Sequence, residues 1–108
     1  MKLVKIISSG RRGKKYLAIF KRDDGSEKKV HFGAKGMRDY TRISDRKSSF
    51  YIKDKEEREK VKSAYIARHK KREPWTSPDN AGTLSKYILW NLPTMAASIK
   101  MFKKRFGV

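Results

Sequence analysis

Residues 16–32 read YLAIFKRDDGSEKKVHF, two short β-prone runs divided by a polar turn. An Asp-Asp-Gly sequence between such runs is typical of a hairpin turn. A third β-prone run at 3–7 precedes them, and two glycines, Gly10 and Gly13, lie in the connection. Short runs joined by glycine-containing turns predict a three-stranded antiparallel meander over residues 1–33.

The central part of the chain is predicted to hold a loop and a long helix. Residues 34–53 are largely polar and show no hydrophobic period, which predicts an irregular loop, and its length favours a function or a partner contact. Asp54 is placed to cap a helix of roughly residues 55–72, with acidic side chains in its first turns and basic ones in its last, as the helix dipole favours. Its apolar stripe is narrow, so we expect it to pack lightly, and Pro74 ends it.

Residues 81–106 form the most apolar helical part. Side chains around Leu84 and Ile88 recur at helical spacing and are apolar on nearly every side, which predicts the buried centre of the protein. Thr94 is the expected N-cap of a last helix that ends before Gly107. We therefore expect one α+β domain over residues 1–108: a small three-stranded meander at 1–33, the loop at 34–53, and a part with three helices at 54–106.

The charge of the chain restricts the kind of partner. Twenty-nine Lys and Arg face eleven Asp and Glu, for a formal net charge of +18. The excess is spread along the chain, with fifteen basic and five acidic residues in 1–50 and fourteen and six in 51–108. Such a balance favours an anionic partner, whether nucleic acid, an anionic membrane or an acidic protein.

Three groups of basic residues are the candidate contacts. They lie in the first turn of the meander, at the end of the long helix, and on one stripe of the last helix. Five consecutive helical positions at 68–72 turn through ~400°, so they do not all face one partner. For each group a solvated surface is the alternative. The predicted phosphate contacts are Arg11, Arg12, Lys14, Lys15, Arg68, Lys71, Arg72, Lys100, Lys103 and Lys104.

The sequence lacks the common signals of catalysis and metal binding. There is no cysteine, which excludes a disulfide and a thiolate zinc site, and the only histidines, His31 and His69, are predicted in separate elements. No nucleophile elbow and no Walker-type phosphate loop occurs. We therefore predict no enzyme activity, no catalytic residues, no cofactor, no metal and no small-molecule substrate. No apolar run approaches the ~18 residues of a membrane span, so no transmembrane segment is predicted.

Three stretches carry a family resemblance: FGAKGMRDYT at 32–41, YIARHKKREPW at 65–75, and AGTLSKYILWNLPTMAASIKMFKKRF at 81–106. Together they resemble a family of small basic proteins of unassigned function from large nucleocytoplasmic DNA viruses of algae and protists. The resemblance covers roughly residues 32–106, and the stretch 41–65 is longer here, as though residues near 46–54 were inserted. It implies an origin in a large DNA virus and supplies no catalytic residues.

With the charge, the resemblance implies a non-enzymatic protein that is made in the host cytoplasm and localises to the virion. The leading hypothesis is binding of the genome, as double-stranded DNA, largely without sequence preference. The alternative is a minor capsid or cement protein that stabilises the shell by contacting acidic surfaces of capsid proteins.

Overall fold

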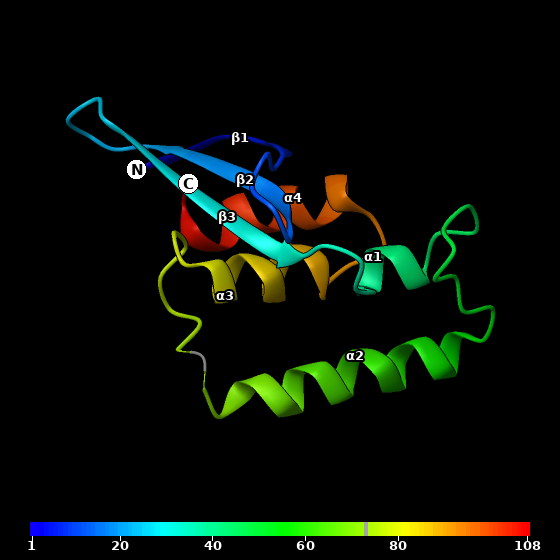
Figure 1. Cartoon of the computed structure of the whole chain (residues 1–108). Coiled ribbons are helices and arrows are strands. Elements are labelled where there is room, and N and C mark those ends of the chain that lie inside the picture. Colours follow the sequence, from blue (N-terminus) through cyan, green and yellow to red (C-terminus); the bar gives the residue numbers. More distant parts are fainter. Residues whose placement is uncertain (73) are drawn as a thin grey trace.

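The computed structural model describes residues 1–72 and 74–108 and shows the predicted α+β arrangement, with an N-terminal sheet followed by helices (Figure 1). The strands are β1 (Lys2–Ser8), β2 (Lys14–Lys21) and β3 (Glu27–Ala34). The helices are α1 (Tyr40–Ile43), α2 (Lys55–Lys70), α3 (Ala81–Leu84), η1 (Ser85–Leu89) and α4 (Met95–Phe106), where η1 is a π-helical turn that continues α3.

The sheet is the meander that the sequence predicts. Both strand pairs are antiparallel in the order β1-β2-β3, with Tyr16 opposite Phe32. The turn between β2 and β3 is closed by the amide of Gly25, which donates to the carbonyl of Arg22 at 3.0 Å. Gly25 has φ +87°, a left-handed conformation that glycine adopts without strain. Local turn chemistry therefore decides this half of the fold.

The core lies between the sheet and the segment formed by α3 and η1. Phe20 and Phe32 of the sheet are fully buried, as are Leu84 and Ile88, so the predicted buried centre is confirmed. Phe102 of α4 joins the same cluster. Figure 1 shows α3 and α4 beneath the sheet and α2 as the outermost layer.

The helix ends follow the predicted caps. The Asp54 carboxylate accepts from the amide of Glu56 at 3.0 Å, and the Thr94 hydroxyl accepts from the amide of Ala97 at 3.2 Å. Gly107 ends α4 in the left-handed conformation, with φ +66°. None of the residues of α2 is buried, which confirms that this helix packs lightly.

The prediction of an irregular loop over residues 34–53 is wrong in one part. The stretch contains α1, a single helical turn whose N-cap is Asp39. Four residues are too few to show a hydrophobic period, which is why the pattern did not indicate this helix. The buried Asp39 that starts it also belongs to the candidate site.

Candidate functional site

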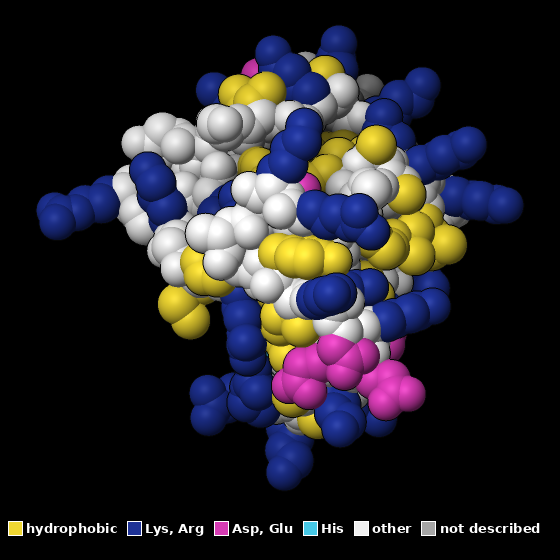
Figure 2. All heavy atoms as spheres, turned by 90° about the vertical axis from the view of Figure 1, so that its right-hand side faces the viewer, with side chains coloured by type: hydrophobic (Ala, Val, Ile, Leu, Met, Phe, Trp, Pro, Cys, Tyr) yellow, Lys and Arg dark blue, Asp and Glu magenta, His cyan; other side chains and the backbone are white. Residues whose placement is uncertain are grey.

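Most of the predicted contact residues lie at the surface. All ten residues are exposed or half-buried as whole residues, and nine of them, all except Lys15, have side chains that make no hydrogen bond or ion pair with any residue in 1–72 or 74–108. Figure 2 shows Lys and Arg spread over the visible face, while most of the acidic side chains in view gather in one patch in its lower part. The first turn of α2 holds two of the acidic residues of the chain, Glu56 and Glu57.

Lys15 is the exception, and its prediction as a phosphate contact does not agree with its position. Its Nζ lies 2.7 Å from Oδ2 of Asp39, and the two side chains are only 5% and 1% exposed. Asp39 also accepts from the side chain of Arg42 at 2.8 Å and from the hydroxyl of Thr41. The charge of Lys15 is therefore used inside the protein, where it joins β2 to α1.

A glycine on the neighbouring strand makes room for this ion pair. Gly33 of β3 has φ +81°, and a Cβ atom there would lie 3.0 Å from Leu89 Cδ1 and 3.2 Å from Lys15 Cβ. Both values are too short for an ordinary contact, so the absence of a side chain lets Lys15 cross β3 on its way to Asp39. Glycine is required here by conformation and by space.

The protonation of the pair follows from its surroundings. Burial lowers the pKa of the Lys15 amine more strongly than its hydrogen bond to Asp39 raises it. For Asp39, burial acts to raise the pKa, but the hydrogen bonds from Lys15 and Thr41 outweigh it and hold the pKa below its usual value. The carboxylate is thus ionised at neutral pH, with its charge compensated by two cations.

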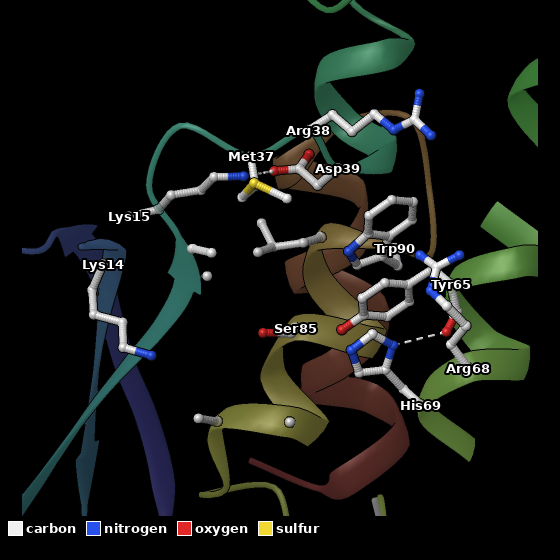
Figure 3. Close-up of a pocket in the computed structure, with 15 residues that line it drawn as sticks. Lys14, Lys15, Met37, Arg38, Asp39, Tyr65, Arg68, His69, Ser85 and Trp90 are labelled. Carbon is white, nitrogen blue, oxygen red and sulfur yellow. Dashed lines mark hydrogen bonds and ion pairs between the residues drawn. The ribbon is translucent and has the colours of Figure 1, made fainter. Parts of the chain in front are cut away.

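Beside this pair lies a cavity of about 480 Å³. The end of β3 and the loop after it form one side, α2 forms another, and α3 with η1 forms the floor. Three cations without a described ion-pair partner line it: Lys14, Arg38 and Arg68. Figure 3 shows Lys14 on one side and Arg68 on the other, with Arg38 above Trp90. The cavity thus brings together residues from two of the three predicted basic groups.

An aromatic stack forms one wall of the cavity. The ring of Tyr65 lies between His69, with centroids 4.0 Å apart, and Trp90, with centroids 4.2 Å apart and planes only 7° from parallel. The His69 Nδ1 bonds to the Tyr65 carbonyl at 2.9 Å, which is consistent with a protonated Nδ1 donating to that oxygen (Figure 3). The stack attaches α2 to the body of the protein, because Trp90 belongs to the core cluster.

The other predicted groups lie elsewhere. Lys71 and Arg72 line a second pocket at the end of α2, which Arg68 also lines, so the three predicted cations of this helix end lie together. Lys100, Lys103 and Lys104 lie exposed on α4. Arg11 and Arg12 lie exposed in the turn between β1 and β2. The cations therefore occupy several surfaces, although Arg68, Lys71 and Arg72 share the pocket at the end of α2.

The electrostatic effect of the first turn is visible at His31. Its Nδ1 shares a hydrogen bond of 2.6 Å with the hydroxyl of Ser9. Desolvation, together with the nearby charges of Arg11 and Lys14, lowers the pKa of His31. The charges of Arg11 and Lys14 thus add to a lowering of the pKa that is mainly due to desolvation, and an anion bound beside them would offset their part.

Sequence reasoning missed Arg38 and the aromatic wall. Arg38 is a single basic residue in a stretch without a period, so only its position across from α2 marks it. Tyr65, His69 and Trp90 come from segments that are joined only by the fold. In the described part of the chain, no three His, Asp or Glu side chains gather as they would around a metal ion. No helix among the described residues has the length and apolar character needed to cross a membrane.

A comparison with protein families assigns the chain to one of them. A family of unknown function (DUF5754) matches residues 4–69, which is more than half of the sequence. The chain belongs to the DUF5754 family. In this DUF5754 protein the matched part includes Lys14, Arg38 and Arg68, whereas Trp90 and α4 lie beyond it. No curated protein and no solved structure matches the chain.

Proposed function

We propose that this DUF5754 protein is a non-enzymatic nucleic-acid-binding protein that recognises phosphate charge largely without sequence preference. The observation that carries the proposal is the set of nine predicted cations that lie at the surface without a described partner. Lys and Arg side chains that neutralise phosphates release counterions, and this term is independent of base sequence. The charge of +18 supplies many such contacts.

The distribution of these cations also favours contact with more than one strand or duplex. Side chains of the first turn, the end of α2 and α4 belong to separate elements and are exposed. A protein with several basic surfaces bridges polyanion segments and reduces their mutual repulsion. With the viral resemblance, this supports association with the double-stranded DNA genome inside a virion.

A titration tests the proposal directly. The affinity for a random-sequence duplex is measured by fluorescence anisotropy as salt rises from about 50 to 200 mM, where contact with six to ten phosphates lowers affinity by ~10³–10⁵. We expect sub-micromolar affinity at the low end and a steep fall. A lysine peptide of equal charge is the control. If the protein binds the duplex no more tightly than the peptide does, the proposal that the folded protein binds nucleic acid is rejected.

A structural role in the capsid shell is the second proposal, and one observation favours it. Val4 and Ile7 on the edge strand β1 are 48% and 42% exposed, and apolar side chains on a strand edge suit contact with another protein. For this role, particles opened gently and treated with nuclease should retain the protein in the shell fraction. Release of the protein together with the DNA would exclude this role and support genome binding.

A further inference from the structure

The cavity beside α2 has the charge of an anion site. Lys14, Arg38 and Arg68 come from β2, the loop after β3 and α2, and none of them is paired among the residues that the structure describes. Among the described residues that line the cavity, Asp39 is the single carboxylate, and Lys15 and Arg42 compensate its charge. Cations around a concave site with low-dielectric walls raise the local potential more than the same cations on a flat surface.

The walls of the cavity suit more than a bare phosphate. Met37, Leu89 and the Tyr65–Trp90 stack offer apolar and aromatic surface, whereas phosphate oxygens need only donors and cations. Its volume of about 480 Å³ falls within the ~300–1,000 Å³ typical of small-ligand sites. A nucleotide, which joins a planar base to a phosphate, can contact the apolar and aromatic wall with its base and the cations with its phosphate.

The cavity also distinguishes unpaired from paired nucleotides. In a duplex the bases are stacked on each other, so only the backbone and the groove edges are open to a protein. Bases of a single strand are free to turn outward and rest on aromatic or apolar side chains. Both faces of Tyr65 are already covered by His69 and Trp90, so an entering base lies against the edge of this stack and against Leu89 and Met37.

We propose that this cavity binds one unpaired nucleotide of a single-stranded nucleic acid. Its phosphate and those of the neighbouring nucleotides contact the cations around the cavity, with Arg38 and Arg68 on one side and Lys14 on the other, and the apolar wall contacts its base. The inference rests on the proposed nucleic-acid binding and adds a preferred form of the ligand to it. A free nucleotide offers the same chemistry, so it serves as a second probe.

The experiment compares two double variants of the full chain. Arg38→Gln with Arg68→Gln removes two cavity charges, and Lys103→Gln with Lys104→Gln removes two charges from α4, where neither residue lines the cavity. Calorimetry measures binding of three ligands: thymidine monophosphate, an oligothymidylate of ~12 nucleotides, and a duplex with the same number of phosphates. The length of the oligothymidylate falls within the ~4–16 nucleotides of known single-strand sites. Thermal unfolding confirms that both variants are folded.

We expect the cavity variant to lose roughly tenfold or more in affinity for the oligothymidylate and for the mononucleotide, relative to the α4 variant, because charge-assisted hydrogen bonds are lost. Both variants should lower duplex affinity to the same extent. Equal losses of both variants for the single strand would overturn the inference, as would failure of the wild type to bind the mononucleotide. Displacement of the oligothymidylate by polyglutamate at equal charge concentration would also overturn it, since the site would then accept any polyanion. The duplex measurement tests the proposed function separately: if the wild type does not bind the duplex, the proposed function itself is rejected.

Discussion

Lys14 and Lys15 are neighbours on β2, and the structure assigns them opposite roles. Lys14 is half-buried at the cavity without a described partner, while Lys15 is paired with Asp39 at 2.7 Å and almost wholly buried. We therefore predict that Lys15→Met reduces stability and leaves binding of a duplex unchanged. Lys14→Met should do the reverse.

The magnitudes follow from the partners that remain. Removing one member of a buried ion pair costs about 3–5 kcal/mol when the other charge is left alone. Here Asp39 keeps its bonds to Arg42 and Thr41, so the cost of Lys15→Met should be near 2–3 kcal/mol. With a urea dependence of about 1–1.5 kcal/mol per molar for a small domain, the unfolding midpoint falls by about 2 M. Lys14→Met should change stability by less than about 0.5 kcal/mol.

Urea unfolding and duplex titration of the same two variants provide the measurements. Lys14→Met should reduce the slope of log affinity against log salt by about 0.9, the contribution of one phosphate contact, and Lys15→Met should not change it. The reasoning is refuted if Lys15→Met unfolds no more easily than Lys14→Met, or if Lys15→Met is the variant that flattens the salt dependence. Either result would mean that the ion pair between Lys15 and Asp39 does not form when the protein is in solution.

The pH dependence of the same variant gives an independent check. The pKa of Asp39 is lower in the folded protein than in the unfolded chain, so the unfolded chain binds the proton more readily. The stability that the ionised carboxylate contributes is therefore present above its unfolded pKa of ~3.9 and is lost as pH falls through the folded pKa. The difference in unfolding free energy between the wild type and Lys15→Met should shrink in that acidic range. A difference that stays constant down to low pH would contradict an electrostatic origin.

Three further predictions concern other parts of the fold. Partial burial and the cations of the first turn lower the pKa of His31 below its usual value, and addition of duplex should raise it in an NMR titration of the ring protons; an unchanged pKa would exclude phosphate contact at this turn. Gly33→Ala should cost about 2–3 kcal/mol in urea unfolding, because it combines a left-handed backbone with a crowded Cβ, whereas Gly25→Ala, in open space, should cost only about 1–2 kcal/mol. Burial and the 2.6 Å hydrogen bond to Glu59 raise the pKa of Tyr40 to about 12. Tyr40→Phe should therefore remove a phenol that titrates near 12 from an ultraviolet titration, and about 1 kcal/mol of stability.

Local rules were sufficient for much of the fold. The meander follows from turn residues such as Gly25, and the caps Asp54 and Thr94 follow from side chains that bond to amides within three positions. These interactions depend on residues close in sequence, so a single sequence reveals them. The helix α1 was missed because its four residues show no hydrophobic period, and because the contact between its cap, Asp39, and Lys15 of a distant strand is not visible in the local sequence.

The candidate site was less predictable because it depends on tertiary contacts. Charge alone does not distinguish Lys14 from Lys15. The alternation of side chains along a strand places the two lysines on opposite faces. Which of them pairs with a carboxylate depends on the position of Asp39, which lies 24 residues after Lys15 in the sequence. Arg38 gives no signal of its own in the sequence. It gains its meaning only when Arg68 of α2 is placed across the same cavity.

The position of α2 connects the stability of the fold to the cavity. The contacts that hold this helix include those of Glu59, Lys62 and Tyr65. Glu59 accepts from the hydroxyl of Tyr40, Lys62 donates to the carbonyl of Asn91 at 2.6 Å, and Tyr65 stacks on Trp90. Spacings of three residues place these side chains on one face of the helix, and Val61 also packs against the core, so the docking stripe is largely polar and aromatic where an aliphatic one is usual. Arg68 lies at the cavity only while this stripe is docked. A nucleotide held by Lys14 on the body and Arg68 on α2 would add a link across the same junction, so binding and docking of α2 should reinforce each other.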